Sequence, residues 1–181
     1  QRGALDEADA LLHRAQQRAP DSATVLCNLG ALARQFGDDA AAERHYRQAL
    51  RHDPACVPAL NNLAGLLFAQ QRPVEAAQHY RKALTIAPGY VPARSNLAAC
   101  LLALDRGGEA LVEAGRAVRE GAGHAPSWLA LAQVRQALGQ HDAAAEAYGK
   151  AIALGLRDAD SLYGLAQALD EIGQWPRAIE L

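Results

Sequence analysis

Three asparagines at equal spacing are the clearest candidates for chemistry in this chain of 181 residues. They are Asn28, Asn62 and Asn96, and the interval from the first to the second is the same as that from the second to the third. An amide side chain offers both a donor and an acceptor, so it can pair with the backbone of an extended peptide whatever the peptide's side chains are. If each asparagine lies at the same place in a repeated unit, the spacing predicts a ladder of peptide-binding amides.

A repeat with a period of about 34 residues runs through the whole chain. Two series of alanines follow it, Ala8, Ala42, Ala76, Ala110, Ala144 and Ala178, and Ala15, Ala49, Ala83, Ala117 and Ala151. Each period contains two apolar blocks joined by a short turn of Gly, Pro or Asp, which is typical of two antiparallel helices. We expect four full repeats, at 23–56, 57–90, 91–124 and 125–158. Residues 1–22 are then the second helix of a partial repeat, and residues 159–181 are another partial repeat.

The repeat resembles a known family. The residues that carry the resemblance are Leu60, Leu63, Ala64, Leu67, Ala76, Tyr80, Ala83 and Pro88, and they are similar to the consensus of the tetratricopeptide repeat. The resemblance implies an all-α fold, a right-handed α-solenoid of antiparallel helix pairs. The first helices of the pairs would line a concave groove and the second helices would form the convex back. Alanines at the contacts agree with this, because helices approach to about 8 Å only where small side chains meet.

Helical spacing from the buried Leu63, Ala64 and Leu67 predicts which side chains face the groove. Thr24 and Gln136 are among them, and the candidate peptide-binding residues are Asn28, Arg34, Gln35, Asn61, Asn62, Phe68, Ser95, Asn96 and Gln133. The asparagine ladder is similar to the one in the superhelical arm of protein O-GlcNAc transferases, where it holds substrate backbones. Asparagine is also frequent at this place in the family for local structural reasons, so a structural ladder is the alternative. Ala130 and Gly164 interrupt the ladder further along the chain.

Other kinds of site find less support in the sequence. A carboxylate clamp, as in co-chaperones of heat-shock proteins, needs several cations, and Arg34 is the only one well placed, since Arg94 and Arg135 lie nearer the helix interface. No catalytic motif, cofactor or metal site is predicted. The histidines and basic residues of the second helices, such as His79 and Lys82, are expected to form a solvated face, and the repeated tyrosines are expected to pack between helices.

The composition sets the remaining expectations. A net charge of −2 does not suggest a nucleic-acid partner, and no apolar run is long enough for a membrane span. Cys27, Cys56 and Cys100 share no metal-ligand spacing and are expected to be free buried thiols, which favours the cytoplasm without excluding the periplasm. Neither end carries a polar capping helix, so we expect a fragment of a longer protein.

The sequence therefore predicts a non-enzymatic protein-interaction module that binds a peptide or partner protein in its groove. Two alternatives stay open. In one, the array is the substrate-recognition arm of a larger enzyme such as a peptide glycosyltransferase. In the other, it is a scaffold that self-associates through its uncapped ends.

Overall fold

The computed structural model describes residues 10–12 and 14–174, and the chain divides into two compact units, residues 1–88 and 89–181. The helices of the first unit are α2 (Ala23–Gln35), α3 (Asp39–His52), α4 (Val57–Ala69) and α5 (Pro73–Ile86). Those of the second unit are α6 (Val91–Ala103), α7 (Gly107–Glu120), α8 (Ala125–Ala137), α9 (His141–Ala153) and α10 (Ala159–Glu171). The described residues contain no strand, and residues 10–12 and 14–18 are also helical.

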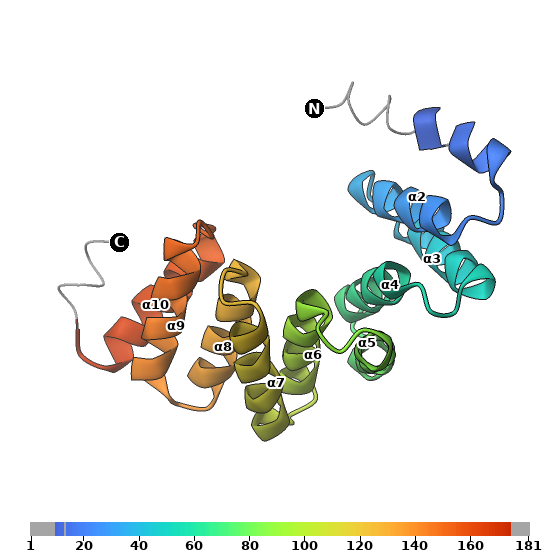
Figure 1. The fold of residues 1–181 in the computed structure, drawn as a ribbon. Helices are drawn as coiled ribbons and strands as arrows, with labels where there is room; N and C mark the ends of the chain where they lie inside the picture. Colours follow the sequence, from blue (N-terminus) through green and yellow to red (C-terminus); the bar gives the residue numbers. More distant parts are fainter. Residues whose placement is uncertain (1–9, 13, 175–181) are drawn as a thin grey trace. The chain divides into compact units, whose positions relative to one another are not determined.

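Within each unit, consecutive helices pack as antiparallel pairs (Figure 1). In the first unit α2 packs on α3 and α4 packs on α5, and α2 also lies against α4. In the second unit α6 pairs with α7 and α8 pairs with α9, and α6 likewise lies against α8. The prediction of an all-α array of helix pairs is confirmed. That all six repeats form one continuous array stays a prediction, as do the parts of the first and last repeats that lie outside the described residues.

Capping residues and a proline define several helix starts. The Ser22 hydroxyl accepts a hydrogen bond from the Val25 amide at the start of α2, at 3.4 Å, and the Asp38 carboxylate accepts one from the Ala41 amide at the start of α3, at 2.8 Å. Such caps satisfy amides that have no partner within the helix. Pro73 is the first residue of α5, where its missing amide hydrogen costs nothing.

The repeated alanines and tyrosines form the core of both units. Those alanines of the two series that are 0% exposed are Ala42, Ala49, Ala76, Ala83, Ala110, Ala117, Ala144 and Ala151. Ala15 is half-buried, while Ala8 and Ala178 lie outside the described residues. Tyr46, Tyr80 and Tyr148 are buried, which confirms that they pack between helices. No helix in the described ranges is long and apolar enough to cross a membrane.

Candidate functional site

In the first unit α2 lies against α4, and we call the side of these two helices that carries Arg34, Gln35 and Asn62 the α2/α4 face. A cavity of about 370 Å³ lies on it, lined by Ala31, Arg34, Gln35, Tyr46 and Asn62. Three of the residues predicted to face the groove, Arg34, Gln35 and Asn62, thus come together around one hollow.

A glycine allows the Tyr46 ring to reach this cavity from α3. Gly30 lies directly against the ring, and a Cβ atom added to Gly30 would be 2.6 Å from the nearest ring carbon. Any side chain at this position would therefore displace the tyrosine. Burial raises the pKa of Tyr46 to about 12, so at neutral pH its hydroxyl is uncharged and can donate a hydrogen bond.

Arg34 gives the cavity its charge. Its side chain is exposed, and within the described part of the chain it forms no ion pair or hydrogen bond. Its guanidinium lies close to Gly65 of α4, since a Cβ atom added there would be 3.7 Å from Nη1. An unpaired guanidinium beside an amide is suited to a carboxylate or to peptide carbonyl oxygens.

Asn62 already has partners inside the protein. Its Nδ2 donates to the sulfur of Cys27 on α2 at 3.7 Å, and its Oδ1 accepts from Nδ2 of Asn61 at 3.2 Å. Burial raises the pKa of Cys27 to about 11, so the sulfur is a neutral thiol and a weak acceptor. A peptide carbonyl would be a stronger acceptor for the same amide, and the contact with Cys27 meanwhile holds Asn62 in a defined orientation.

The other predicted residues are more scattered. Asn28 and Gln35 of α2 are exposed, and Phe68 of α4 is half-buried. Asn96 and Gln133 are exposed on α6 and α8, in the second unit. That Asn28, Asn62 and Asn96 form one row therefore stays a prediction.

Ser95 was predicted to face the groove, and this is wrong. It is 3% exposed, and its hydroxyl donates to the carbonyl of Val91 at 3.1 Å and lies 2.8 Å from the hydroxyl of Ser127 on α8. The side chain points toward the neighbouring first helix rather than outward, because two small serines let α6 and α8 pack closely here. Cys27, which occupies the same repeat position in α2, is buried as well.

The second unit carries an amide pair that the asparagine spacing did not indicate. Nε2 of Gln136 on α8 donates to Oε1 of Gln167 on α10 at 2.6 Å, and the Tyr148 hydroxyl donates to Oε1 of Gln136. Gly164, where the ladder has no asparagine, lies against the Tyr148 ring. Gln136 was predicted to face the groove, but Gln167 was not. The signal that could have found it is that Gln167 lies one repeat after Gln133, at the same groove-facing position.

Arg94 and Arg135, the cations near the helix interface, bind other groups within the protein. Arg94 is 3% exposed and bound to Glu113 and Glu120, and Nη1 of Arg135 donates to the carbonyl of Ala143 at 3.0 Å. Neither can join Arg34 in a ring of donors around a carboxylate. The described residues also contain no group of three or more His, Cys, Asp or Glu side chains arranged to hold a metal ion.

Comparison with known proteins agrees with this architecture. Residues 27–91 and 129–181 match a family model described as a tetratricopeptide repeat, and residues 67–134 match a second model with the same description. No curated protein sequence is significantly similar to the chain.

Solved structures with the same fold exist. PilF of Pseudomonas aeruginosa gives a TM-score of 0.83 at 24% identity, over 99% of this chain and 82% of that one. PilW, a type IV pilus biogenesis factor, gives 0.86 at 23% identity, over 99% and 84% of the two chains. YrrB, described as having an unusual peptide-binding site, gives 0.68 at 18% identity, over 93% and 87%. None of the three is described as an enzyme, and at such identities the likeness concerns the fold alone.

Proposed function

The chain belongs to the tetratricopeptide repeat family, whose members typically serve as protein–protein interaction modules, and we propose that its α2/α4 face binds an extended segment of a partner protein. The observation that carries the proposal is the cavity in which Arg34, Gln35 and Asn62 meet. A few polar side chains around one hollow are the usual means of fixing the orientation of a ligand, and the Asn62 amide keeps one N–H beyond its contact with Cys27.

The division of labour follows from the side chains. Asn28 and Asn62 would pair with the peptide backbone, which makes their contribution independent of the partner's sequence. Arg34 would select an acidic side chain or a carboxylate, because it is the cation on this face without an internal partner among the described residues. That YrrB is described as having a peptide-binding site supports the view that the fold accommodates such ligands.

The experiment begins with peptides selected from a random linear library displayed on phage, using the wild-type chain as bait. Dissociation constants of the selected peptides are then measured by fluorescence polarisation for the wild type and for Asn28→Ala/Asn62→Ala. Two lost hydrogen bonds of about 0.5–1.5 kcal/mol each predict a loss of affinity of about tenfold or more. Arg34→Ala should weaken the acidic peptides selectively.

The matched control is Gln78→Ala, which removes an exposed amide from α5, outside this face. It should leave affinity unchanged, and circular dichroism should show equal helicity for all variants. If selected peptides bind the double asparagine variant and Arg34→Ala as tightly as the wild type, the α2/α4 face is not the binding site. The asparagines are then structural.

A further inference from the structure

A second cavity, of about 280 Å³, lies in the first unit between α3, α4 and α5, and it shares no lining residue with the cavity of the α2/α4 face. Its lining comes from three helices: Arg47, Leu50 and Arg51 of α3, Leu60 and Leu63 of α4, and His79 and Lys82 of α5. We call it the basic cavity, because Arg47, Arg51, His79 and Lys82 make up its rim, next to the leucines. Nothing in the proposed function uses these residues.

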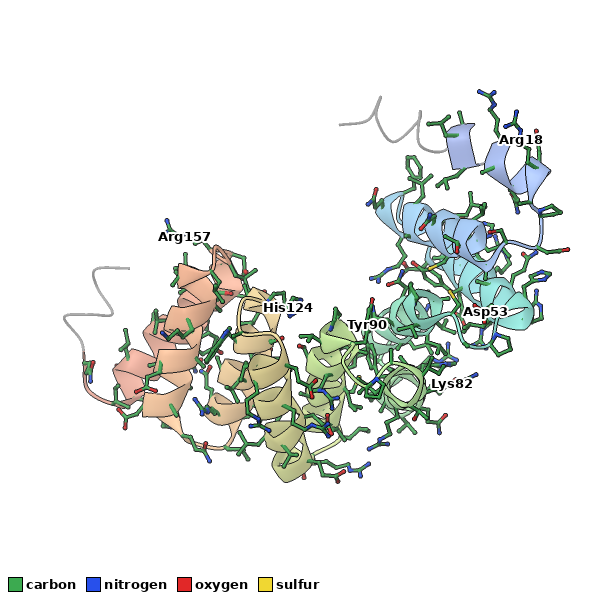
Figure 2. All side chains as sticks on the ribbon, in the orientation of Figure 1. Arg18, Asp53, Lys82, Tyr90, His124 and Arg157 are labelled. Atoms are coloured by element: carbon green, nitrogen blue, oxygen red, sulfur yellow. The ribbon has the colours of Figure 1, made fainter. Side chains whose placement is uncertain are left out.

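The positive charge of the rim is only partly neutralised. Arg47 is paired with Glu43 at 2.7 Å, but Arg51 and Lys82 are exposed and form no ion pair in the ranges that the structure describes. Figure 2 labels Lys82 on α5. The pKa of His79 is lowered, chiefly by burial and further by Arg47 and Lys82, against a smaller opposing effect of Glu75. Cations near the ends of helices do stabilise the helix dipole, but this does not explain why they surround a leucine-lined hollow.

The size of the basic cavity limits what it can hold. Pockets for whole small molecules or cofactors measure about 300–1,000 Å³, so this one is at the lower limit and has room for little more than a single side chain. Leu50 is half-buried and gives the cavity an apolar wall, whereas Leu60 and Leu63 lie behind it at 0% and 1% exposure. The wall at Leu50 favours an apolar group, and the surrounding cations favour carboxylates. A ligand with both features is a peptide in which an apolar residue is flanked by acidic ones.

We propose that the basic cavity is a second binding site, which takes an acidic segment of a partner protein. One apolar side chain of the segment enters the cavity, and carboxylates on either side of it pair with Arg51 and Lys82. The site is separate from the α2/α4 face and does not depend on it. Nucleic acid fits less well, because a phosphate backbone makes no apolar contact with leucine and usually binds a longer row of cations.

The second unit provides an internal comparison. Two repeats further along the chain, the places of Arg51 and Lys82 are taken by Arg119 and Lys150. The places of Arg47 and His79 are taken by Gly115 and Ala147, so only half of the rim is repeated there. A double substitution at Arg119 and Lys150 therefore removes the same charge from the same register without altering the basic cavity.

The test uses a fluorescein-labelled peptide with one central leucine between two glutamates on each side, titrated by polarisation at low salt. Arg51→Ala/Lys82→Ala should weaken binding about tenfold, as expected for the loss of two ion pairs at one site. Arg119→Ala/Lys150→Ala should leave the dissociation constant within about twofold of the wild-type value. Replacing the peptide's leucine by glycine should weaken binding to the wild type. In the wild type, bound peptide should raise the pKa of His79, followed by NMR, because its carboxylates offset Arg47 and Lys82.

Several results would overturn the proposal. Equal losses in the two double variants would mean that the peptide responds only to overall charge. If the glycine peptide bound as tightly as the leucine peptide, the cavity would not bind an apolar side chain. Tighter binding of a single-stranded oligonucleotide, or of vesicles containing phosphatidylserine, would assign the rim to another class of partner. Asn28→Ala/Asn62→Ala should bind this peptide like the wild type, and a loss there would place the peptide on the α2/α4 face instead.

Discussion

Replacing Arg94 with alanine should destabilise the second unit by about 3 kcal/mol. The side chain is 3% exposed on α6, and it is held by two carboxylates of α7. Nη1 lies 2.8 Å from Glu113 and Nε lies 2.8 Å from Glu120. The substitution therefore removes the cation that joins the two helices and leaves two acidic groups facing each other.

The magnitude follows from how deeply the partners are buried. Removing one member of a fully buried ion pair costs about 3–5 kcal/mol, because the remaining charge is left without compensation. Here the side chains of Glu113 and Glu120 are 21% and 32% exposed, so water can partly replace the lost arginine. Glu120 also keeps Arg116 at 3.6 Å. Both facts place the expected loss at the lower end of the range.

Urea unfolding followed by tryptophan fluorescence isolates this effect, because both tryptophans, Trp128 and Trp175, belong to the second unit. With a denaturant dependence of about 1–3 kcal/mol per molar, the midpoint should fall by about 1–3 M. The matched control is Arg106→Ala, which breaks a pair with Glu109 whose side chains are 43% and 55% exposed. Such exposed pairs contribute about 0–1 kcal/mol.

The variant Arg94→Met/Glu113→Gln/Glu120→Gln tests the cause, since it removes the arginine together with the charges that would be left behind. It should recover a large part of the loss seen in Arg94→Ala. If Arg94→Ala lowers the midpoint no more than Arg106→Ala does, the buried cluster does not stabilise the unit and the reasoning is wrong.

Two further predictions concern packing and titration. Gly30→Ala should destabilise the first unit by about 1–3 kcal/mol, because its Cβ would collide with the buried Tyr46 ring. Gly65→Ala should stabilise the unit by about 0.5–1 kcal/mol, because its Cβ would be 3.4 Å from the nearest atom and alanine favours helix. If the urea midpoints of the two variants, followed by circular dichroism, moved in the same direction, this reasoning would be contradicted. Burial raises the pKa of Cys27 to about 11 and of Cys100 to about 12, so both thiols should resist Ellman's reagent at pH 8 in the native chain and react fully in urea. Because the native state favours the protonated thiols, the stability they contribute is complete below about pH 9 and should decline as the pH rises toward 11–12, which lower urea midpoints would show.

The helices and the core could be predicted because the repeat period fixes which side of each helix is buried. Two helices were expected in each repeat, and α3 (Asp39–His52) and α5, which begins at Pro73, are second helices of such pairs. Burial of Ala76 and Ala83 depends only on each helix facing its partner in the same pair. Such local pairing is encoded within one repeat, so a pattern read along the sequence is sufficient.

The candidate site was harder to predict, because it depends on contacts between successive repeats. Ser95 and Asn61 occupy the same repeat position, yet Ser95 is buried against Ser127 and Asn61 is half-buried beside Asn62. The burial of Ser95 depends on its partner on α8 being another small hydroxyl side chain. Periodicity says nothing about that neighbour.

One pair of repeat positions shows how the same backbone can carry a cavity in one place and a buried ion cluster in another. Leu60 and His79 line the basic cavity, and one repeat later their places are taken by Arg94 and Glu113, whose charged groups are 2.8 Å apart. Both Leu60 and Arg94 are buried, and the charge of Arg94 is tolerated because the residue opposite has become acidic. Leucine with histidine instead lies at a cavity with an apolar wall and a cationic rim. Binding sites in this chain are therefore expected where a repeat keeps small or apolar residues at positions that another repeat fills with paired charges.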